Sequence, residues 1–275
     1  MENLAQNAPP REMRQTDVMD PARAAALLAT LGRPAAMQTG DTLPPFFHQI
    51  YFWQALPPAE LGRDGHPATG ASDNSVIPDL GLPRRMWAGG RLEFHAPLRA
   101  GLAAEKITTV ADISRKTGRS GPLGFVTLQH DIMQDGQLTT REFQDLVYRE
   151  DPAPDAAKPQ PPVAPVDETH AEPAVFDTTL LFRYSALTFN GHRIHYDEAY
   201  SRQTEGYDGL VSHGPLLAQL LMLLAERQLG PLSRFEFRAT SPLMHHEAAT
   251  LCWRDDGTLW VRGPDGRQNM TAKAS

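Results

Sequence analysis

Cysteine is almost missing from this sequence. Its 275 residues include one cysteine, Cys252, so no disulfide can form within the chain and the fold must be held together without one. Such cysteine usage is typical of a reducing compartment, and we expect the protein to be cytoplasmic.

Long apolar runs and an excess of positive charge are missing as well. The longest apolar run, LLAQLLMLLA over 216–225, has about half the length of a membrane span, so we interpret it as a buried helix and expect no membrane insertion. The 26 Lys and Arg residues against 33 Asp and Glu residues give a formal net charge of −7, which leaves no basic stripe for the phosphates of a nucleic acid. Residues 1–19 contain no apolar signal-peptide core, and we predict a disordered tail there.

Proline, in contrast, is concentrated in one stretch. Residues 150–173, EDPAPDAAKPQPPVAPVDETHAEP, contain seven prolines and almost nothing that a core could bury. This composition predicts a semi-extended linker over 150–174. The linker would separate an N-terminal unit over 20–149 from a C-terminal unit over 175–275.

The N-terminal unit is predicted to start with a helix and continue with strands. Asp20 as N-cap, Pro21 as the first helical residue and Gly32 after ARAAALLATL delimit the helix. The aromatic run PPFFHQIYFWQALPP that follows is too apolar for a loop. Alternating apolar and polar residues then predict antiparallel strands, joined at Asp135-Gly136 by a hairpin turn, over 91–98, 105–116, 124–134 and 137–149.

The C-terminal unit is predicted to begin with a strand, TLLFRYSALT, over 179–188, and to continue with a helix over 213–230. Three further strands and a tail follow, the strands over 234–243, 247–256 and 258–266. The segments RLEFHAPLRAG and RFEFRATSPLMHH, one from each unit, resemble each other. We therefore interpret the chain as a degenerate internal duplication, two units that each place one long helix against an antiparallel sheet.

The densest group of titratable residues is FNGHRIHYDE over 189–198, which allows three interpretations. As a metal site, His192 and His195 would share one face of a helix, with His213 or His245-His246-Glu247 as further ligands. No zinc signature appears, so we expect no metal. As a polar turn, Asn190-Gly191 would reverse the chain and leave the histidines solvated. As a catalytic loop, it would supply a histidine for proton transfer.

The segment that follows favours the catalytic interpretation. Ser212-His213-Gly214-Pro215 opens the apolar helix, and a helix start offers unpaired backbone N–H groups and a positive dipole end to a developing oxyanion. Gly214 lets a ligand approach this backbone closely. A histidine-bearing loop beside such a helix start is the minimum for proton transfer at a thioester carbonyl.

At these residues the sequence resembles a known family. YSALTFNGHRIHYD followed by GLVSHGPL is similar to the signature of the MaoC-like, R-specific enoyl-thioester hydratases and dehydratases of the hotdog fold. The version FNxHRIHYD, together with the stretch PPFFHQIYFW…RRMWAGGRLEF, resembles the branch of the type-two hydroxyacyl-thioester dehydratases and the mesaconyl-C4-CoA (or itaconyl-CoA) hydratases. The resemblance implies an α+β double hotdog that hydrates or dehydrates a short acyl-CoA.

The resemblance also assigns roles to residues of the loop. It implies that His195 is the catalytic histidine and that the backbone N–H of Gly214 polarises the thioester carbonyl. At the position of the family's aspartate stands Asn190, which cannot ionise and is expected to orient the water or the imidazole. His192 or Asp197 could take over part of the missing role.

Other residues are candidates for substrate binding, each with a plain structural alternative. The aromatic side chains of Tyr184 and Phe189 could line the acyl pocket or belong to a core, and His192 and His213 flank the expected site. Arginines could meet a substrate carboxylate or the phosphates of CoA, or be solvated, and the candidates are Arg193, Arg183 and Arg84-Arg85.

The expected ligand is the acyl-CoA itself, with no cofactor and no metal, and the chain could form a homodimer. Three other functions compete. A dehydratase of longer 3-hydroxyacyl thioesters would use the same site. A hotdog thioesterase would place a carboxylate near the start of the long helix, which carries only Glu226, three turns along. A non-catalytic acyl-CoA-binding protein would have a decayed site.

Overall fold

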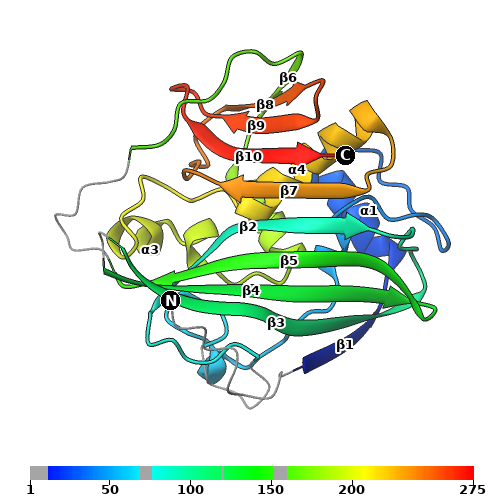
Figure 1. Ribbon diagram of the computed structural model, residues 1–275, viewed down its shortest axis with the longest axis horizontal. Helices are drawn as coiled ribbons and strands as arrows, with labels where there is room; N and C mark the ends of the chain where they lie inside the picture. Colours follow the sequence, from blue (N-terminus) through cyan, green and yellow to red (C-terminus); the bar gives the residue numbers. More distant parts are fainter. Residues whose placement is uncertain (1–11, 69–75, 119–120, 152–159) are drawn as a thin grey trace.

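The chain folds around one large antiparallel sheet. The computed structural model describes residues 12–68, 76–118, 121–151 and 160–275. In this part of the chain ten strands form a single sheet in the order β1-β3-β4-β5-β2-β7-β10-β9-β8-β6 (Figure 1). The strands are β1 (Glu12–Val18), β2 (Arg84–Phe94), β3 (Ala103–Gly118), β4 (Gly121–Gln134), β5 (Gln137–Arg149), β6 (His170–Ala174), β7 (Arg234–Ala239), β8 (Ala249–Arg254), β9 (Thr258–Arg262) and β10 (Gln268–Ala274).

The helices are fewer and mostly short. They are α1 (Pro21–Thr30), α2 (Thr178–Leu187), α3 (Glu198–Gln203) and α4 (Gly214–Leu229), with the 3-10 helices η2 (Phe47–Ile50), η3 (Pro58–Glu60) and η4 (Arg193–His195). Within the described residues no helix is both long and apolar enough to cross a bilayer.

The sheet consists of two halves with the same strand order. In each half the first strand lies at the outer edge and the second lies at the junction, which gives β1-β3-β4-β5-β2 followed by β7-β10-β9-β8-β6. At the junction β2 pairs with β7, and Leu92 lies opposite Phe235. These are the two strands whose sequences resemble each other, so the structure accounts for the resemblance that suggested a duplication.

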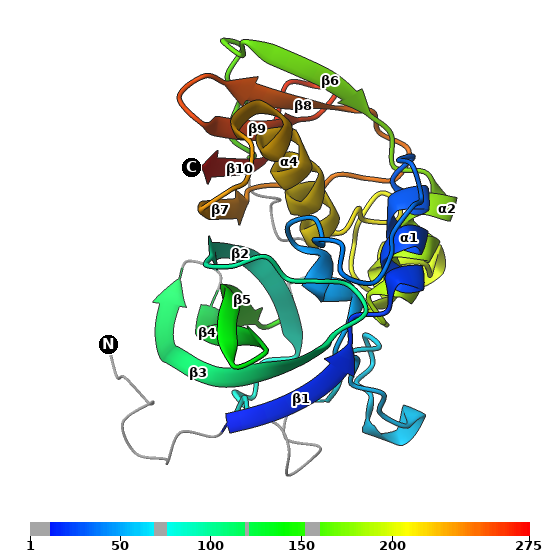
Figure 2. The ribbon, with the colours of Figure 1, turned by 90° about the vertical axis from the view of Figure 1, so that its right-hand side faces the viewer.

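The long helix predicted over 213–230 is confirmed as α4. It is apolar on nearly all sides because it lies inside the molecule, where it packs against β7, β8, β9 and β10 (Figure 2). Pro215 fits its first turn, where a missing N–H leaves no helical bond unmade, and Gly230 ends it with a positive φ of 83°.

The helix predicted in the first half is present but does not cover the sheet. The predicted Asp20 cap is confirmed, since its side chain accepts a hydrogen bond from Ala22 N at 2.8 Å, but α1 has 10 residues and packs against α2 and η2. The aromatic run after it forms η2, with Phe46, Phe47 and Ile50 buried. One long helix on the sheet therefore describes only the C-terminal half.

The segment predicted as a strand over 179–188 is a helix, α2. Asp177 caps it by accepting a hydrogen bond from Leu180 N at 2.7 Å. The buried residues Leu181, Tyr184 and Ser185 follow a spacing of three and four, which is the period of a helix. The β-branched and aromatic composition of the segment suggested the wrong element.

Three predicted tails and linkers contain strands. Residues 12–18 of the predicted tail form β1 against β3, and 170–174 of the predicted linker form β6 against β8. The predicted C-terminal tail forms β10, which lies between β7 and β9. The outer strand of each half thus lies beyond the predicted unit boundaries, and residues 152–159 of the linker lie outside the described part of the chain.

Candidate active site

His195 is buried in η4, in a loop between α2 and α3. Its side chain is 6% exposed, and its Nδ1 lies 2.7 Å from the backbone oxygen of Val211. A carbonyl oxygen only accepts hydrogen bonds, so Nδ1 carries the proton and Nε2 keeps its lone pair. Burial, helped by the neighbouring His192, holds the pKa of His195 well below its ordinary value. The imidazole is therefore neutral near pH 7, the form that a general base requires.

His213 lies directly against this imidazole. The two rings stack with their centroids 3.7 Å apart and their planes at 22°. His213 Nε2 is 2.8 Å from Ser185 Oγ of α2, and burial holds the pKa of His213 well below its ordinary value. The ring of Tyr184, also from α2, meets His213 edge-on at 5.0 Å. The structure thus brings together three of the predicted site residues.

Several buried polar atoms around these rings have no hydrogen-bond partner among the described residues. They are Tyr184 Oη, Ser212 Oγ and His213 Nδ1. Buried polar atoms in proteins are nearly always bonded, so three such atoms in one place indicate a position where a polar ligand or water binds. All three lie on the two segments that flank His195, α2 and the start of α4.

Gly214 begins α4 beside His213, as predicted. The first N–H groups of a helix have no partner within it, and the helix dipole makes this end positive. A Cβ placed on Gly214 would meet no heavy atom of the described residues within 4 Å, so open space adjoins this backbone. The arrangement suits the approach of a thioester oxygen to the backbone N–H of Gly214.

Asn190, the residue at the family's aspartate position, shapes the loop. Its Oδ1 accepts a hydrogen bond from His192 N at 3.0 Å, and its own N–H donates to Ser185 O at 2.8 Å. The side chain therefore closes a turn around Gly191. Its carbonyl oxygen is used by the backbone, which leaves only the amide N–H groups to orient a water.

A second turn of the same kind, which the sequence analysis missed, lies against the first. In Asp64-Gly65-His66 the Oδ1 of Asp64 accepts from His66 N at 3.0 Å. The two turns touch through their backbones, since Arg193 N donates to Asp64 O at 2.9 Å. A Cβ on Gly65 would lie 2.0 Å from the backbone oxygen of Gly191. The repeated pattern Asx-Gly-His was the available signal.

The rings of His66, His192, His195 and His213 follow one another and are called the histidine row below. The contact between the turns brings Asp64 and His66 of the N-terminal half to this row. The ring of His66 lies 4.4 Å from that of His192, which meets His195 edge-on at 5.3 Å. His66 Nδ1 is 3.2 Å from Asp64 Oδ2. Burial and the charge of His66 lower the pKa of His192 to about 3. Burial raises the pKa of Asp64, but the bonds from His66 outweigh it and the carboxyl titrates below its usual range.

The same residues form a possible metal-binding group. The ligand atoms of Asp64, His66 and His192 lie within 4.8 Å of one another. This set differs from the one considered from the sequence, because it includes neither His195 nor His213. Two imidazoles and one carboxylate are ligand types that zinc accepts.

Phe189 and Arg193 point elsewhere. Phe189 has a positive φ of 52°, is half exposed and stacks on Trp53 at 5.2 Å. Arg193 is 40% exposed and forms an ion pair with Asp197 at 2.7 Å. Asp197 also caps α3 by accepting from Tyr200 N, so both of its oxygens are engaged. The structure brings neither predicted binding residue to the histidine row.

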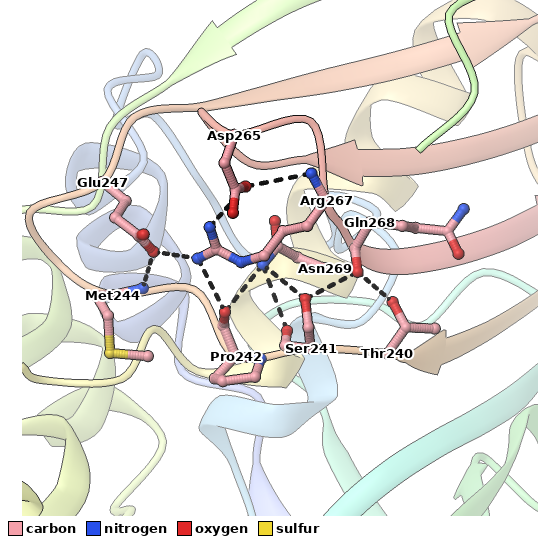
Figure 3. Close-up of polar contacts among 9 residues, drawn as sticks. All are labelled: Thr240, Ser241, Pro242, Met244, Glu247, Asp265, Arg267, Gln268 and Asn269. Atoms are coloured by element: carbon pink, nitrogen blue, oxygen red, sulfur yellow. Dashed lines mark hydrogen bonds and ion pairs between the residues drawn. The ribbon is translucent and has the colours of Figure 1, made fainter. Parts of the chain in front are cut away.

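A loop of the C-terminal half holds the Val211 carbonyl that orients His195. Val211 forms a bridge with Met244, and Ser212 N donates to Leu243 O at 2.8 Å. The segment that holds Val211 and Ser212, residues 242–247, is in turn held by Arg267, which bonds to the Glu247 carboxylate and to Pro242 O (Figure 3).

Asn269 of β10 completes this support. It is fully buried, and its Nδ2 donates to Ser241 O, Ser241 Oγ and Pro242 O (Figure 3). The orientation of the His195 imidazole therefore depends on residues more than one strand away, in the segment predicted as a tail.

Comparison with known proteins decides the family. Residues 46–245 match hydroxyacyl-thioester dehydratase type 2, which is most of the chain. The chain belongs to this family. It is 44% identical over 256 residues to the mesaconyl-C(4)-CoA hydratase of Chloroflexus aurantiacus, covering 91% of this chain and 90% of the relative. It is 28% identical over 246 residues to the mitochondrial hydroxyacyl-thioester dehydratase type 2 of Schizosaccharomyces pombe, covering 80% of each.

Solved structures agree on the fold. HtdX of Mycobacterium tuberculosis is 18% identical, with a TM-score of 0.66 over 96% of this chain and 99% of that one. A MaoC-like dehydratase from Phytophthora capsici is 12% identical, with a TM-score of 0.69 over 98% and 96%. A conserved double-hotdog protein of M. tuberculosis is 13% identical, with a TM-score of 0.61 over 99% and 97%.

The predicted double hotdog and the predicted family are both confirmed. The α+β class, with two hotdog halves joined in one sheet, matches these structures. The relatives are named hydratases and dehydratases, and such enzymes add water to a double bond or remove it. The protein is a hydro-lyase of the type 2 hydroxyacyl-thioester dehydratase family.

Proposed function

We propose that the protein reversibly hydrates mesaconyl-C4-CoA to citramalyl-CoA. The observation that carries the chemistry is the hydrogen bond from His195 Nδ1 to Val211 O, because it leaves a neutral, basic Nε2 in a buried position near the start of α4. The choice of substrate follows the relative that shares 44% identity over 91% of this chain.

In the proposed reaction His195 removes a proton from water. As the water oxygen bonds to the β-carbon, the electron pair of the double bond moves toward the thioester, and negative charge develops on the carbonyl oxygen. The N–H of Gly214 stabilises this oxyanion, an effect typically worth about 3 kcal/mol per donor. The imidazolium of His195 then returns the proton to the α-carbon, so that atoms and charge balance and neither a cofactor nor a metal is consumed.

The second polar group at the water is proposed to be His192. Asn190 is engaged in its turn and Asp197 in capping and in its ion pair. His192 meets His195 edge-on and has the carboxylate of Asp64 nearby. It can orient the water as a neutral imidazole, which makes Asp64 and His66 positioning residues rather than catalytic ones.

Two alternatives use the same site. A dehydratase of longer 3-hydroxyacyl thioesters would resemble the S. pombe relative in name, with 28% identity. A non-catalytic acyl-CoA-binding protein would bind thioesters without turning them over. A cytoplasmic location and a homodimer stay predictions, to be measured by fractionation and by sedimentation.

The deciding experiment follows the ultraviolet absorbance of the conjugated enoyl thioester across a panel of dicarboxylic and monocarboxylic acyl-CoAs. We expect turnover of mesaconyl-C4-CoA by the wild type, and a loss of about 10²- to 10⁴-fold in kcat for His195→Ala. The matched control is His130→Ala, which removes a buried histidine from the N-terminal half. Absence of turnover with every thioester, in a folded preparation that binds CoA, would contradict the enzyme assignment.

A further inference from the structure

Arg85 differs from the other arginines near the site in having no hydrogen-bond or ion-pair partner among the described residues. The Arg84 guanidinium forms a buried ion pair with Glu205, Arg193 pairs with Asp197, and Arg63 pairs with Asp151. Among the described residues no carboxylate and no carbonyl oxygen accepts a hydrogen bond from the Arg85 side chain. A partly buried guanidinium is costly to leave without an anion, so this one invites a ligand.

The start of β2 brings Arg85 to the junction of the two halves. Its register partner on β5 is Tyr148, which is 2% exposed, so the two side chains share a face of the sheet that is turned to the interior. Arg84, one residue earlier, reaches Glu205 between α3 and α4. The ion pair of Arg84 therefore connects the beginning of β2 to the segment between α3 and α4, which leads to His213 and Gly214.

The electrostatics agree with this placement. Burial is the main cause of the lowered pKa of His66, and the positive charge of Arg85 lowers it further. The same charge acts on His192, after burial and His66. The charge of the guanidinium thus acts on both imidazoles. The carboxylate of Asp64 is paired with His66, whose Nδ1 lies 3.2 Å from Asp64 Oδ2.

The chemistry of the proposed substrate supplies a suitable anion. In mesaconyl-C4-CoA the free carboxylate is attached to the β-carbon, the atom that receives the hydroxyl group. When that carbon lies at the water held by His195, the carboxylate must lie beside the histidine row. His192 meets His195 at 5.3 Å and His66 at 4.4 Å, so the row leads from the base to the N-terminal half.

We propose that Arg85, together with His192, forms a subsite for a carboxylate on the β-carbon of the acyl group. The subsite selects dicarboxylic over monocarboxylic thioesters. A guanidinium binds a carboxylate through paired N–H donors, and the imidazole of His192 can add one more. The Nδ1–H of His66 is already donated to Asp64. The inference rests on the proposed function for the identity of the substrate, but its test measures binding and does not require turnover.

The test compares two saturated thioesters that differ only in this group. Methylsuccinyl-CoA, with the thioester at the far end from the methyl-bearing carbon, carries the carboxylate, and isovaleryl-CoA carries a methyl group in its place. Calorimetric titration of the wild type is expected to show tighter binding of methylsuccinyl-CoA by about 10- to 100-fold. Arg85→Met is expected to bring this ratio close to one with little change for isovaleryl-CoA, and Arg85→Lys is expected to keep part of it.

The matched control is Arg202→Met, which removes an exposed arginine whose ion pair with Glu198 lies on α3. It is expected to leave both affinities unchanged. Isovaleryl-CoA binding by Arg85→Met shows that this variant is folded, and Arg85→Lys provides a second variant that retains the charge.

Two results would overturn the subsite. If Arg85→Met binds both thioesters equally more weakly, Arg85 lies at the phosphates of CoA. If neither affinity changes, Arg85 takes no part in binding the thioester. Failure of the proposed function is distinguishable, because it would appear as binding of methylsuccinyl-CoA without turnover of mesaconyl-C4-CoA. With turnover present, 3-methylcrotonyl-CoA gives the kinetic version, and its kcat/KM is expected to be unaffected by Arg85→Met.

Discussion

The two halves of the molecule share a strand order and differ in what covers the inner face of their sheet. In the C-terminal half this cover is the apolar helix α4. In the N-terminal half the strands β3, β4 and β5 bury the polar side chains of Thr108, His130, Glu142 and Gln144. His48 of η2 is buried with them. The two duplicated units therefore differ in what they contribute to the site. In the proposed mechanism the C-terminal half holds the base and the oxyanion donor, and the N-terminal half places Asp64 and His66 beside His192.

The polar interior of the N-terminal half can be broken at its buried ion pair. His48 Nε2 lies 2.7 Å from Glu142 Oε2, and both side chains are almost fully buried. Glu142→Ala leaves His48 without its partner, so we expect a loss of about 3–5 kcal/mol in the free energy of unfolding. Urea denaturation measures it. The double variant His48→Phe/Glu142→Leu restores an apolar contact and should recover much of the loss, whereas an unaffected single variant would contradict the pair's role.

The same pair predicts a pH dependence. Burial raises the pKa of Glu142, but the bond from His48 and nearby positive charges outweigh it, so the folded-state pKa lies below the usual value. The stabilisation is therefore complete above the ordinary pKa of a glutamate and is lost as the pH falls through the lower folded-state value. Acid denaturation of the wild type and of the double variant should differ accordingly.

The contact between the halves can be broken at Gly65. A Cβ there would lie 2.0 Å from Gly191 O, and the φ of Gly65 is +86°. We expect Gly65→Ala to cost about 2–3 kcal/mol and to lower kcat, because the turns must separate. Gly32→Ala is the control, since Gly32 also has a positive φ of 68° but open space around its Cβ. Equal melting temperatures of the two variants would show that the contact is unimportant.

The contribution of the N-terminal half to catalysis can be tested at Asp64. Asp64→Asn keeps the turn, because an amide oxygen can also accept from His66 N, but it removes the charge beside the histidine row. We expect kcat/KM to fall about tenfold, which corresponds to about 1.4 kcal/mol. Because the pKa of Asp64 is lowered, the difference from the wild type should persist throughout the neutral range and vanish only in acid. Rescue by Asp64→Glu would distinguish charge from shape.

The smallest effect is expected at Arg193. Its ion pair with Asp197 is exposed, and such pairs contribute about 0–1 kcal/mol. Arg193→Gln should therefore change the unfolding free energy by less than about 1 kcal/mol and leave KM for the thioester nearly unchanged. A large rise in KM would instead restore the sequence prediction that Arg193 binds substrate.

The parts of the site that are local in the chain can be predicted from the sequence. His195 and the helix start at His213-Gly214 lie within twenty residues of each other, and their spacing carries the family signature. Asp64 and His66 could not be predicted because they approach the row through contacts between the halves. Arg85 was one of several arginines named as candidates, and the sequence alone did not single it out. A single sequence contains no record of such long-range contacts, so only the repeated Asx-Gly-His pattern hinted at one.

Similar reasoning explains the errors in the fold. Of the strands of the N-terminal half, β3, β4 and β5 were predicted well because one face alternates clearly, as in β4 and β5. β2 begins seven residues before the predicted strand. β10 was read as a tail because its small and polar residues, such as Ala272 and Asn269, give no strand signal by themselves. They are buried by neighbours that come from elsewhere in the chain, β7 and β9.

The backbone bond between Arg193 N and Asp64 O has a further consequence. At this link an amide proton of one half is protected by an acceptor of the other. Exchange of that proton with deuterated solvent requires the two turns to part, so its protection factor measures the free energy of local opening at the site. The exchange rate of the Arg193 amide proton thus reports how often the two turns separate, and it can be measured without any substrate.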